Sequence, residues 1–230
     1  MSWESSALYY SLINELTRER LGGLHSAPIV MASVDFAPIE KLQARGDWGE
    51  AGRLLAAEAH GLEAAGADFL VLCTNTMHKV ADAIEAAVSI PLLHLGDITA
   101  EAVLATGITT VGLLGTRFTM EEPFYRDRLA EHGLTVLVPQ AEDSATVNRI
   151  IYEELVLGEI RGESRDEYKR VIERLADRGA DGVILGCTEI ELLIGERDSR
   201  LPLFPTTRLH AEAAVEFALR DERITVDDRQ

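Results

Sequence analysis

Two stretches of this chain repeat one another, and the repeat constrains the fold more than any other feature. Residues 66–74 read GADFLVLCT and residues 179–188 read GADGVILGCT. The offset is 113 residues at the first glycine (179 − 66) and 114 at the cysteine (187 − 73), and Gly186 accounts for the difference. Both cysteines of the protein therefore lie at the same point of the repeat. The sequence therefore indicates an internal duplication of one structural unit.

Each cysteine follows a short apolar run, at residues 69–72 and 183–185. Runs of this length that lead into a helical pattern predict buried strands of a parallel sheet. Open α/β sheets bind ligands outside the carboxyl ends of their strands. We therefore expect both thiols to face one crevice.

Apolar runs and helical patterns alternate along the whole chain. We expect strands at residues 28–34, 69–72, 91–95, 109–115, 135–138, 183–185 and 203–205, and helices at 4–20, 47–65, 77–88, 98–105, 121–132, 144–177 with a break near 158–164, 190–194 and 209–219. The alternation predicts an α/β fold of two similar doubly wound parallel-sheet lobes, related by pseudo-twofold symmetry, with the active cleft between them. We expect residues 1–97 plus 206–230 to form the first lobe, with 221–230 as a frayed tail, and residues 98–205 to form the second.

The repeat is incomplete near its start. When Phe124 and Tyr125 are aligned with Tyr9 and Tyr10, Thr116 falls opposite Met1, and the strand at 111–115 has no counterpart. We expect the first lobe to lack its first strand. Because such a strand is normally central, we also expect a form that carries it to be more stable.

Composition narrows the class of protein. The formal net charge of −17 argues against nucleic acid as a partner, since the sequence has no basic stripe. Two cysteines in 230 residues are not a disulfide framework. No apolar run approaches the roughly 18 residues of a membrane span, and no signal pattern is present. We expect a cytoplasmic protein without a membrane partner.

Two opposed thiols suit inversion at a carbon acid, in which one thiolate removes a proton and the other thiol delivers one to the opposite face. A helix that starts just after each cysteine would stabilise the thiolate. Neutral donors suited to a carboxylate lie near the same helix ends: Thr74, Asn75, Thr116 and Thr188. Glu189 either orients a base or caps the next helix.

A structural explanation competes with this one, because a single cysteine at a strand end is commonly an inert core residue. Two cysteines at equivalent repeat positions favour the functional explanation, since an inert role gives no reason for the coincidence. His78, His94 and His210 fit the edge of the core, and their spacing with the cysteines resembles no closed zinc site.

The motifs CTNTMHK at 73–79, LGCTEI at 185–190, MSWES at 1–5 and GTRFTM at 115–120 resemble the aspartate/glutamate racemase family, above all its bacterial branch of broad-specificity or aspartate/glutamate-specific racemases. The resemblance implies two α/β lobes, a homodimer, and catalysis with neither pyridoxal phosphate nor metal. It implies that Cys73 and Cys187 are the catalytic pair. It also implies that Thr74, Asn75, Thr116, Thr188 and Glu189 surround the substrate and that Met1 lies in the loop that closes over it.

An aspartate or glutamate substrate is expected, but the anchor for its side chain is open among Arg45, Lys79, Arg117, Arg161 and Lys169. A basic residue in the cleft would favour an acidic amino acid, and none would favour a neutral one. Alternatives within the superfamily are hydantoin racemase, arylmalonate decarboxylase and maleate isomerase, the last of which uses cysteine as a nucleophile. Outside it, a non-catalytic two-lobed binding protein and a redox-switching dithiol remain.

Overall fold

The computed structural model describes residues 2–220. Met1 and the tail at 221–230, for which the sequence raised expectations, lie outside the described residues. The described residues form a four-stranded parallel sheet in the order β2-β1-β3-β4. Its strands are β1 (Thr110–Gly115), β2 (Thr135–Leu137), β3 (Gly182–Gly186) and β4 (Leu203–Pro205). All four agree with the predicted strands to within a residue or two.

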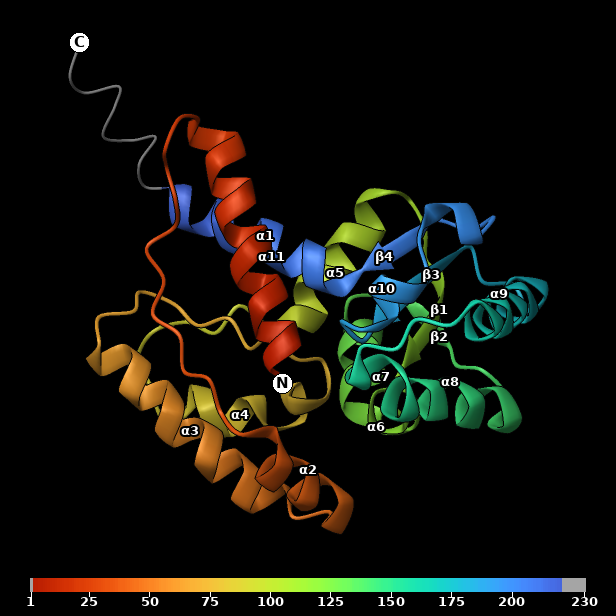
Figure 1. The fold of residues 1–230 in the computed structure, drawn as a ribbon, viewed down its shortest axis with the longest axis horizontal. Coiled ribbons are helices and arrows are strands. Elements are labelled where there is room, and N and C mark those ends of the chain that lie inside the picture. The colour runs from red at the N-terminus through yellow and green to blue at the C-terminus, as the bar shows by residue number, and fades with distance from the viewer. Residues whose placement is uncertain (1, 221–230) are drawn as a thin grey trace.

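Helices precede, connect and follow these strands (Figure 1). In the first half they are α1 (Trp3–Leu21), α2 (Phe36–Arg45), α3 (Trp48–Ala64), the 3₁₀ turn η1 (Thr76–Val80), α4 (Ala81–Glu85) and α5 (Leu95–Ala105). In the second half they are α6 (Arg117–Glu121), α7 (Pro123–Glu131), α8 (Ala141–Glu153), η2 (Leu155–Leu157), α9 (Gly162–Asp177), α10 (Ile190–Leu193), η3 (Glu196–Asp198) and α11 (Thr206–Leu219).

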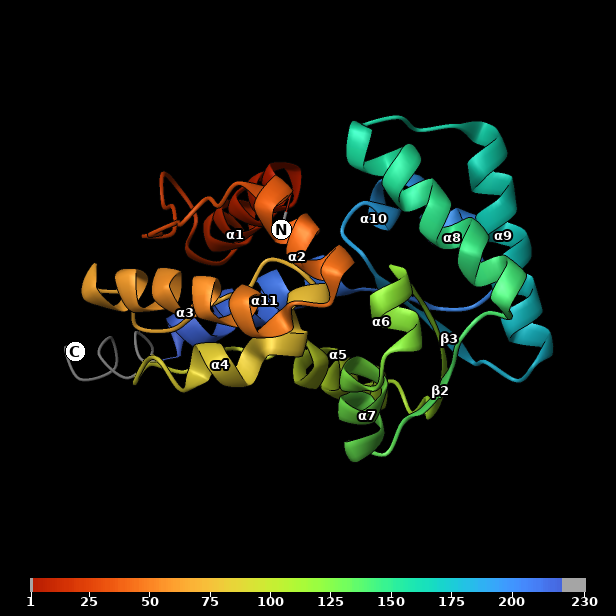
Figure 2. The same cartoon turned by 90° about the horizontal axis from the view of Figure 1, so that it is seen from below.

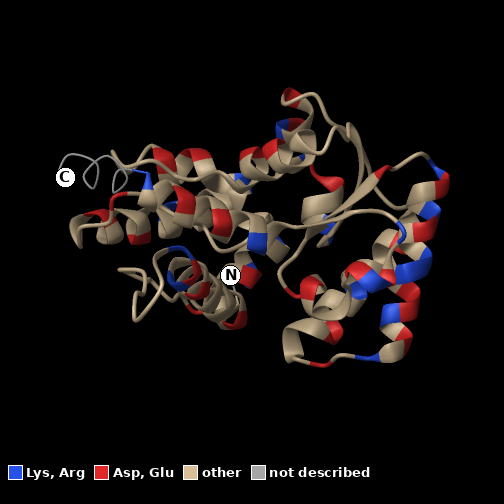
Figure 3. Cartoon of the chain, turned by 90° about the horizontal axis from the view of Figure 1, so that it is seen from above, with Lys and Arg blue, Asp and Glu red and all other residues tan. Residues whose placement is uncertain are grey.

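The sheet of the second lobe lies between two layers of helices (Figure 2). Side chains along a strand alternate between the two faces, so Leu114 and Val183 pack against α8 and α9. Val111 and Ile184 point the other way and join α5 and α7 in a second core. Figure 3 shows the charged residues on the helices and loops, while the strands carry none. The sheet is therefore a rigid apolar platform whose carboxyl edge can carry a site.

The first lobe differs from the prediction. Strands were expected at residues 28–34, 69–72 and 91–95, but within the described residues this lobe contains only an isolated parallel bridge between Leu70 and Leu92. In the second lobe β1 lies between β2 and β3 and pairs with both. No described strand takes the equivalent place in the first lobe. Residues 28–34 therefore run as coil, and Val30 and Met31 are about half exposed.

The two lobes are joined through the last helix. After β4 the chain enters α11, which packs against α1 of the first lobe and against α5 (Figure 1). The α/β class with a parallel sheet is confirmed. The division at residues 97/98 and 205/206 stays a prediction. No helix within residues 2–220 is long and apolar enough to cross a membrane.

Candidate active site

The site is built where β1 and β3 end side by side. Gly115 pairs with Gly186 in the parallel register. A Cβ atom on Gly186 would lie 2.9 Å from the carbonyl oxygen of Leu114, and one on Gly115 would lie 2.9 Å from that of Gly186. Only glycine permits this approach. The two strands consequently deliver Thr116 and Cys187 to the same edge.

A cavity of about 50 Å³ opens at this edge. The loops that follow strands contribute most of its polar side chains, and helices of both lobes contribute most of its apolar ones. The lining residues are Ser2, Phe36, Gln43, Thr74, Asn75, Thr76, Thr116, Ile151, Tyr152, Val156, Gly186, Cys187, Thr188 and Glu189. Thr74, Asn75, Thr116, Thr188 and Glu189 were all predicted to surround the substrate. Phe36, Gln43 and Tyr152 were not.

Cys187 lies in this cavity beside a carboxylate. Its thiol donates a hydrogen bond to Glu189 Oε2 at 3.0 Å, and the Ser2 hydroxyl donates to Glu189 Oε1 at 2.9 Å. Burial, followed by the charge of Glu189, raises the pKa of the Cys187 thiol well above its usual value. Glu189 is thus placed to accept the thiol proton, which favours the orienting role over that of a simple helix cap.

Cys73 occupies a different environment: it is not among the described residues that line the cavity, so the expectation that both thiols face one crevice is met by Cys187 alone. It packs against the small core between α1 and α11, and its Sγ lies 3.6 Å from the carbonyl oxygen of Val71. Burial raises its pKa to about 11. Burial therefore outweighs the thiolate stabilisation expected from a following helix at both cysteines, although the backbone N–H of Glu189 does lower the pKa of Cys187.

Ser5 connects the loops that carry the two cysteines. Its hydroxyl donates to the carbonyl oxygen of Cys73 at 3.1 Å, and its Oγ lies 2.9 Å from Thr188 Oγ1. Since the Ser5 proton is directed to Cys73, Thr188 is the donor in the second bond. The cysteine loops of the two lobes thereby meet at one buried side chain. A second bridge joins Thr76 Oγ1 and Thr116 Oγ1 at 3.0 Å.

A buried histidine holds the loop after Cys73. The backbone N–H of Leu95 donates to His78 Nε2 at 3.1 Å, so His78 Nδ1 carries the proton and donates to the carbonyl oxygen of Thr74 at 2.7 Å. Burial lowers the pKa of His78 well below its usual value, which keeps the ring neutral. The sequence placed this residue only at the core edge.

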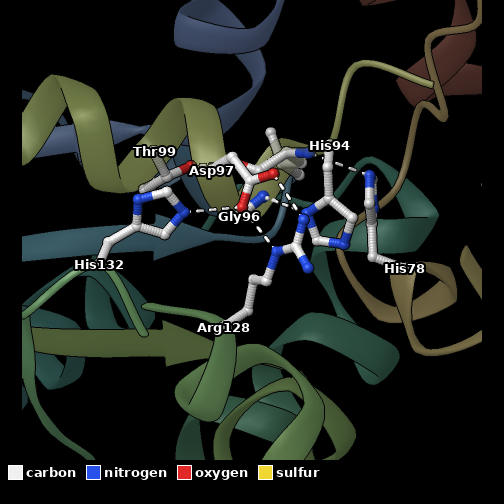
Figure 4. Close-up of polar contacts among 8 residues, drawn as sticks. His78, His94, Gly96, Asp97, Thr99, Arg128 and His132 are labelled. Carbon is white, nitrogen blue, oxygen red and sulfur yellow. Dashed lines mark hydrogen bonds and ion pairs between the residues drawn. The ribbon is translucent and has the colours of Figure 1, made fainter. Parts of the chain in front are cut away.

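The N-terminus of α5 extends this network toward α7 (Figure 4). His94 Nδ1 accepts from the backbone N–H of Gly96 at 3.1 Å, and Asp97 accepts two hydrogen bonds from Arg128 and lies 2.9 Å from His132. Burial alone would raise the pKa of Asp97, but the Arg128 and His132 bonds outweigh it and lower that pKa to about 2. The loop after Cys73 is thus tied to a charged cluster on the second lobe.

The five basic residues proposed as side-chain anchors lie elsewhere. Lys79 pairs with Glu122 and lies over the Trp48 ring, and Arg161 pairs with Glu154 and Glu159. The remaining three also fall outside the cavity lining: Arg45, Arg117 and Lys169. Among the described residues that line the cavity, none is Lys or Arg.

Solved structures resemble this one closely. An Asp/Glu racemase candidate from Yersinia pestis superimposes with a TM-score of 0.90 and 55% identity over 95% of this chain and 96% of that one. An aspartate racemase homologue from Pyrococcus horikoshii OT3 has a TM-score of 0.82 and 34% identity over 94% of each chain. By sequence, the broad specificity amino-acid racemase RacX of Bacillus subtilis (strain 168) is 25% identical over 154 residues, which are 67% of this chain and 66% of the relative.

These likenesses agree with the two-lobed α/β architecture. The model of the family described as Asp/Glu/Hydantoin racemase matches residues 1–214. The chain therefore belongs to the Asp/Glu/Hydantoin racemase family of isomerases.

Proposed function

We propose that this protein inverts the α-carbon of an amino acid without a cofactor, with Cys73 and Cys187 as its two acid–base groups. The observation that carries the proposal is the meeting of both cysteine loops at Ser5, beside one cavity. In one direction a thiolate removes the α-proton, and the opposing thiol protonates the planar carbanion from the other face. In the reverse direction the two sulfurs exchange roles.

Glu189 starts this cycle at Cys187. The thiol already donates to Glu189 Oε2, so transfer of that proton generates the thiolate without help from bulk water. Thr74 and Thr116 line the cavity and supply neutral hydroxyl groups for the α-carboxylate, whereas Thr188 lines it with its hydroxyl proton directed to Ser5. A carboxylate bound by preorganised donors also accepts the charge that develops on the carbanion.

Aspartate or glutamate is the substrate that the sequence and the relatives' names suggest. The relatives from Yersinia pestis and Pyrococcus horikoshii are named for these amino acids, whereas RacX is named for broad specificity. All three names describe racemases of amino acids. The side chain is considered separately below, because the cavity lining bears on it directly.

The proposal is tested by incubating the protein with single enantiomers and following inversion by chiral chromatography, before and after alkylation of the thiols. Alkylation is expected to abolish inversion, and bound substrate to protect. Dialysis against a chelator and treatment with carbonyl reagents are expected to leave activity intact. Turnover of maleate or a hydantoin with no amino acid inverted would favour those isomerases, and full activity after complete alkylation would refute the thiol mechanism.

The homodimer and the cytoplasmic location remain predictions. Trp3, Tyr10 and Leu192 are large apolar side chains with more than half of their surface exposed, as expected for a chain that buries them in an interface. Cell fractionation tests the location.

A further inference from the structure

The cavity has two chemically distinct walls. The loops after the strands, together with Ser2, contribute hydroxyl, amide, thiol and carboxylate groups, whereas α2, α8 and η2 contribute Phe36, Ile151, Tyr152 and Val156 and one amide, that of Gln43, which donates to Met77 Sδ. An amino acid also has two parts: the polar ammonium and carboxylate groups, which every substrate shares, and the side chain, which differs between substrates. The reacting α-carbon must lie near Cys187 and the polar wall. The apolar wall is therefore the one left for the side chain.

Asn75 provides a specific partner for the ammonium group. Thr206 uses its hydroxyl proton on the carbonyl oxygen of Leu185 at 2.9 Å, so it must accept from Asn75 Nδ2 at 3.0 Å. This fixes the amide orientation and leaves Asn75 Oδ1 as an acceptor. Asn75 Oδ1 is buried with no hydrogen-bond partner among the described residues. A buried unpaired acceptor is costly, and an ammonium donor from a ligand would satisfy it.

The charges around the cavity disfavour an acidic side chain. Glu189 is the one charged side chain among the described lining residues. A second carboxylate there would lose its water without meeting a cation and would be repelled by Glu189. Arg117, which follows Thr116, is the nearby cation: its charge acts on Tyr152, but burial outweighs that effect and raises the pKa of Tyr152, and Arg117 itself is exposed and outside the lining.

We infer that the substrate's side chain is uncharged and packs against Phe36, Ile151, Tyr152 and Val156, while Asn75 Oδ1 accepts a hydrogen bond from the α-ammonium group. This inference rests on the proposed function. The inference goes beyond the proposed function because it names the substrate class. A racemase for aspartate or glutamate would instead bind a charged side chain.

The first test measures kcat/KM for inversion of methionine, leucine, glutamine, aspartate, glutamate and lysine by the unmodified protein. The inference expects at least one uncharged amino acid to exceed every charged one by 10-fold or more. A preference for aspartate, glutamate or lysine would overturn the inference and leave the racemase proposal intact. Inversion of none of these, with no α-deuteration in deuterated water, would refute both.

The second test places a cation in the apolar wall. Val156→Lys is expected to reduce kcat/KM for the best uncharged substrate at least 10-fold and to raise the ratio of aspartate to uncharged turnover by a similar factor. Leu157→Lys is the matched control, because Leu157 is exposed and lies outside the lining. An unchanged ratio in folded Val156→Lys protein would overturn the assignment of this wall. If that variant does not fold, the substrate comparison above decides alone.

Discussion

Glu189 links the sequence motif to the chemistry at the residue scale. Its carboxylate accepts from both the Cys187 thiol and the Ser2 hydroxyl, so it couples the cysteine to the first turn of α1. Its charge also contributes to the raised pKa of Cys187. The same group thus keeps the thiol protonated at rest and offers the nearest destination for its proton.

Glu189→Gln separates these two effects. Without the negative charge the pKa of Cys187 falls, so alkylation of this thiol at fixed pH becomes faster. Racemisation is expected to fall by about 100-fold or more, since general acid–base groups contribute on that order. Glu196→Gln, at an exposed position on η3, is the control and should change neither rate. Wild-type racemisation by Glu189→Gln would remove Glu189 from proton transfer.

At the scale of elements, the close approach of β1 and β3 determines where the site lies. Gly186→Ala would bring its Cβ against the Leu114 carbonyl, and we expect a loss of roughly 1–3 kcal/mol in the free energy of unfolding, typical of overpacking. Gly195→Ala is the matched control, because no atom lies within 4 Å of its Cβ position and its φ is −129°. Urea denaturation compares the two. Equal stabilities would contradict the packing argument.

His210, a buried histidine on α11, predicts that the stability of the fold depends on pH. His210 lies 2.9 Å from the Tyr9 hydroxyl and 2.8 Å from the Leu93 carbonyl oxygen, and burial lowers its pKa to about 4. Between pH 6.5 and 4 the unfolded chain binds a proton that the folded chain does not, so stability falls as pH falls. The full effect is roughly 3 kcal/mol.

Urea denaturation at several pH values checks this expectation. His210→Gln should flatten the decline below pH 6.5, while His25→Gln, at an exposed position, should leave it unchanged. The quantity compared is the slope of the unfolding free energy against pH, so a loss of stability that is equal at every pH does not affect the comparison. An identical slope in His210→Gln would contradict the argument.

Elements were predicted best from the sequence where a local run of apolar residues is enough to specify them. β1 and β3 are mainly apolar runs predicted from the sequence, and Thr116 and Cys187 directly follow their ends. The run at 28–34 looked equally strand-like, yet a strand also needs a hydrogen-bonded neighbour, which no local pattern reports. Likewise Phe36 and Tyr152 reach the cavity only because α2 and α8 pack across it. The apolar lining of the cavity thus depends on tertiary packing, which the sequence does not report. The cysteine loops could be identified because they belong to an internal repeat.

At the scale of the whole molecule, polar contacts and one helix join the two lobes. The polar contacts include Ser2 with Glu189, Ser5 with Thr188, Thr76 with Thr116 and Lys79 with Glu122, and α11 provides the apolar connection. A site divided in this way depends on the relative position of the lobes. Changes remote from the cysteines can therefore reach the chemistry.

Association of two copies is a further prediction at this scale. We expect sedimentation equilibrium to give twice the mass of the chain, and Trp3→Glu to shift the equilibrium toward monomer because Trp3 is 69% exposed. Ala57→Glu, which adds the same charge at an exposed position on α3 without removing a large apolar side chain, is the comparison and should not shift it. A monomeric wild-type protein at micromolar concentration would contradict this prediction.

The two-base mechanism is tested most directly by Cys73→Ser and Cys187→Ser, each incubated in deuterated water with separate enantiomers of the best substrate. Chiral chromatography reads inversion, and mass spectrometry reads α-deuterium. The account predicts that each variant loses inversion by several orders of magnitude, while each retains α-deuteration of the enantiomer whose proton faces the remaining cysteine, with opposite preferences in the two variants. A variant that inverts both enantiomers at the wild-type rate would contradict it.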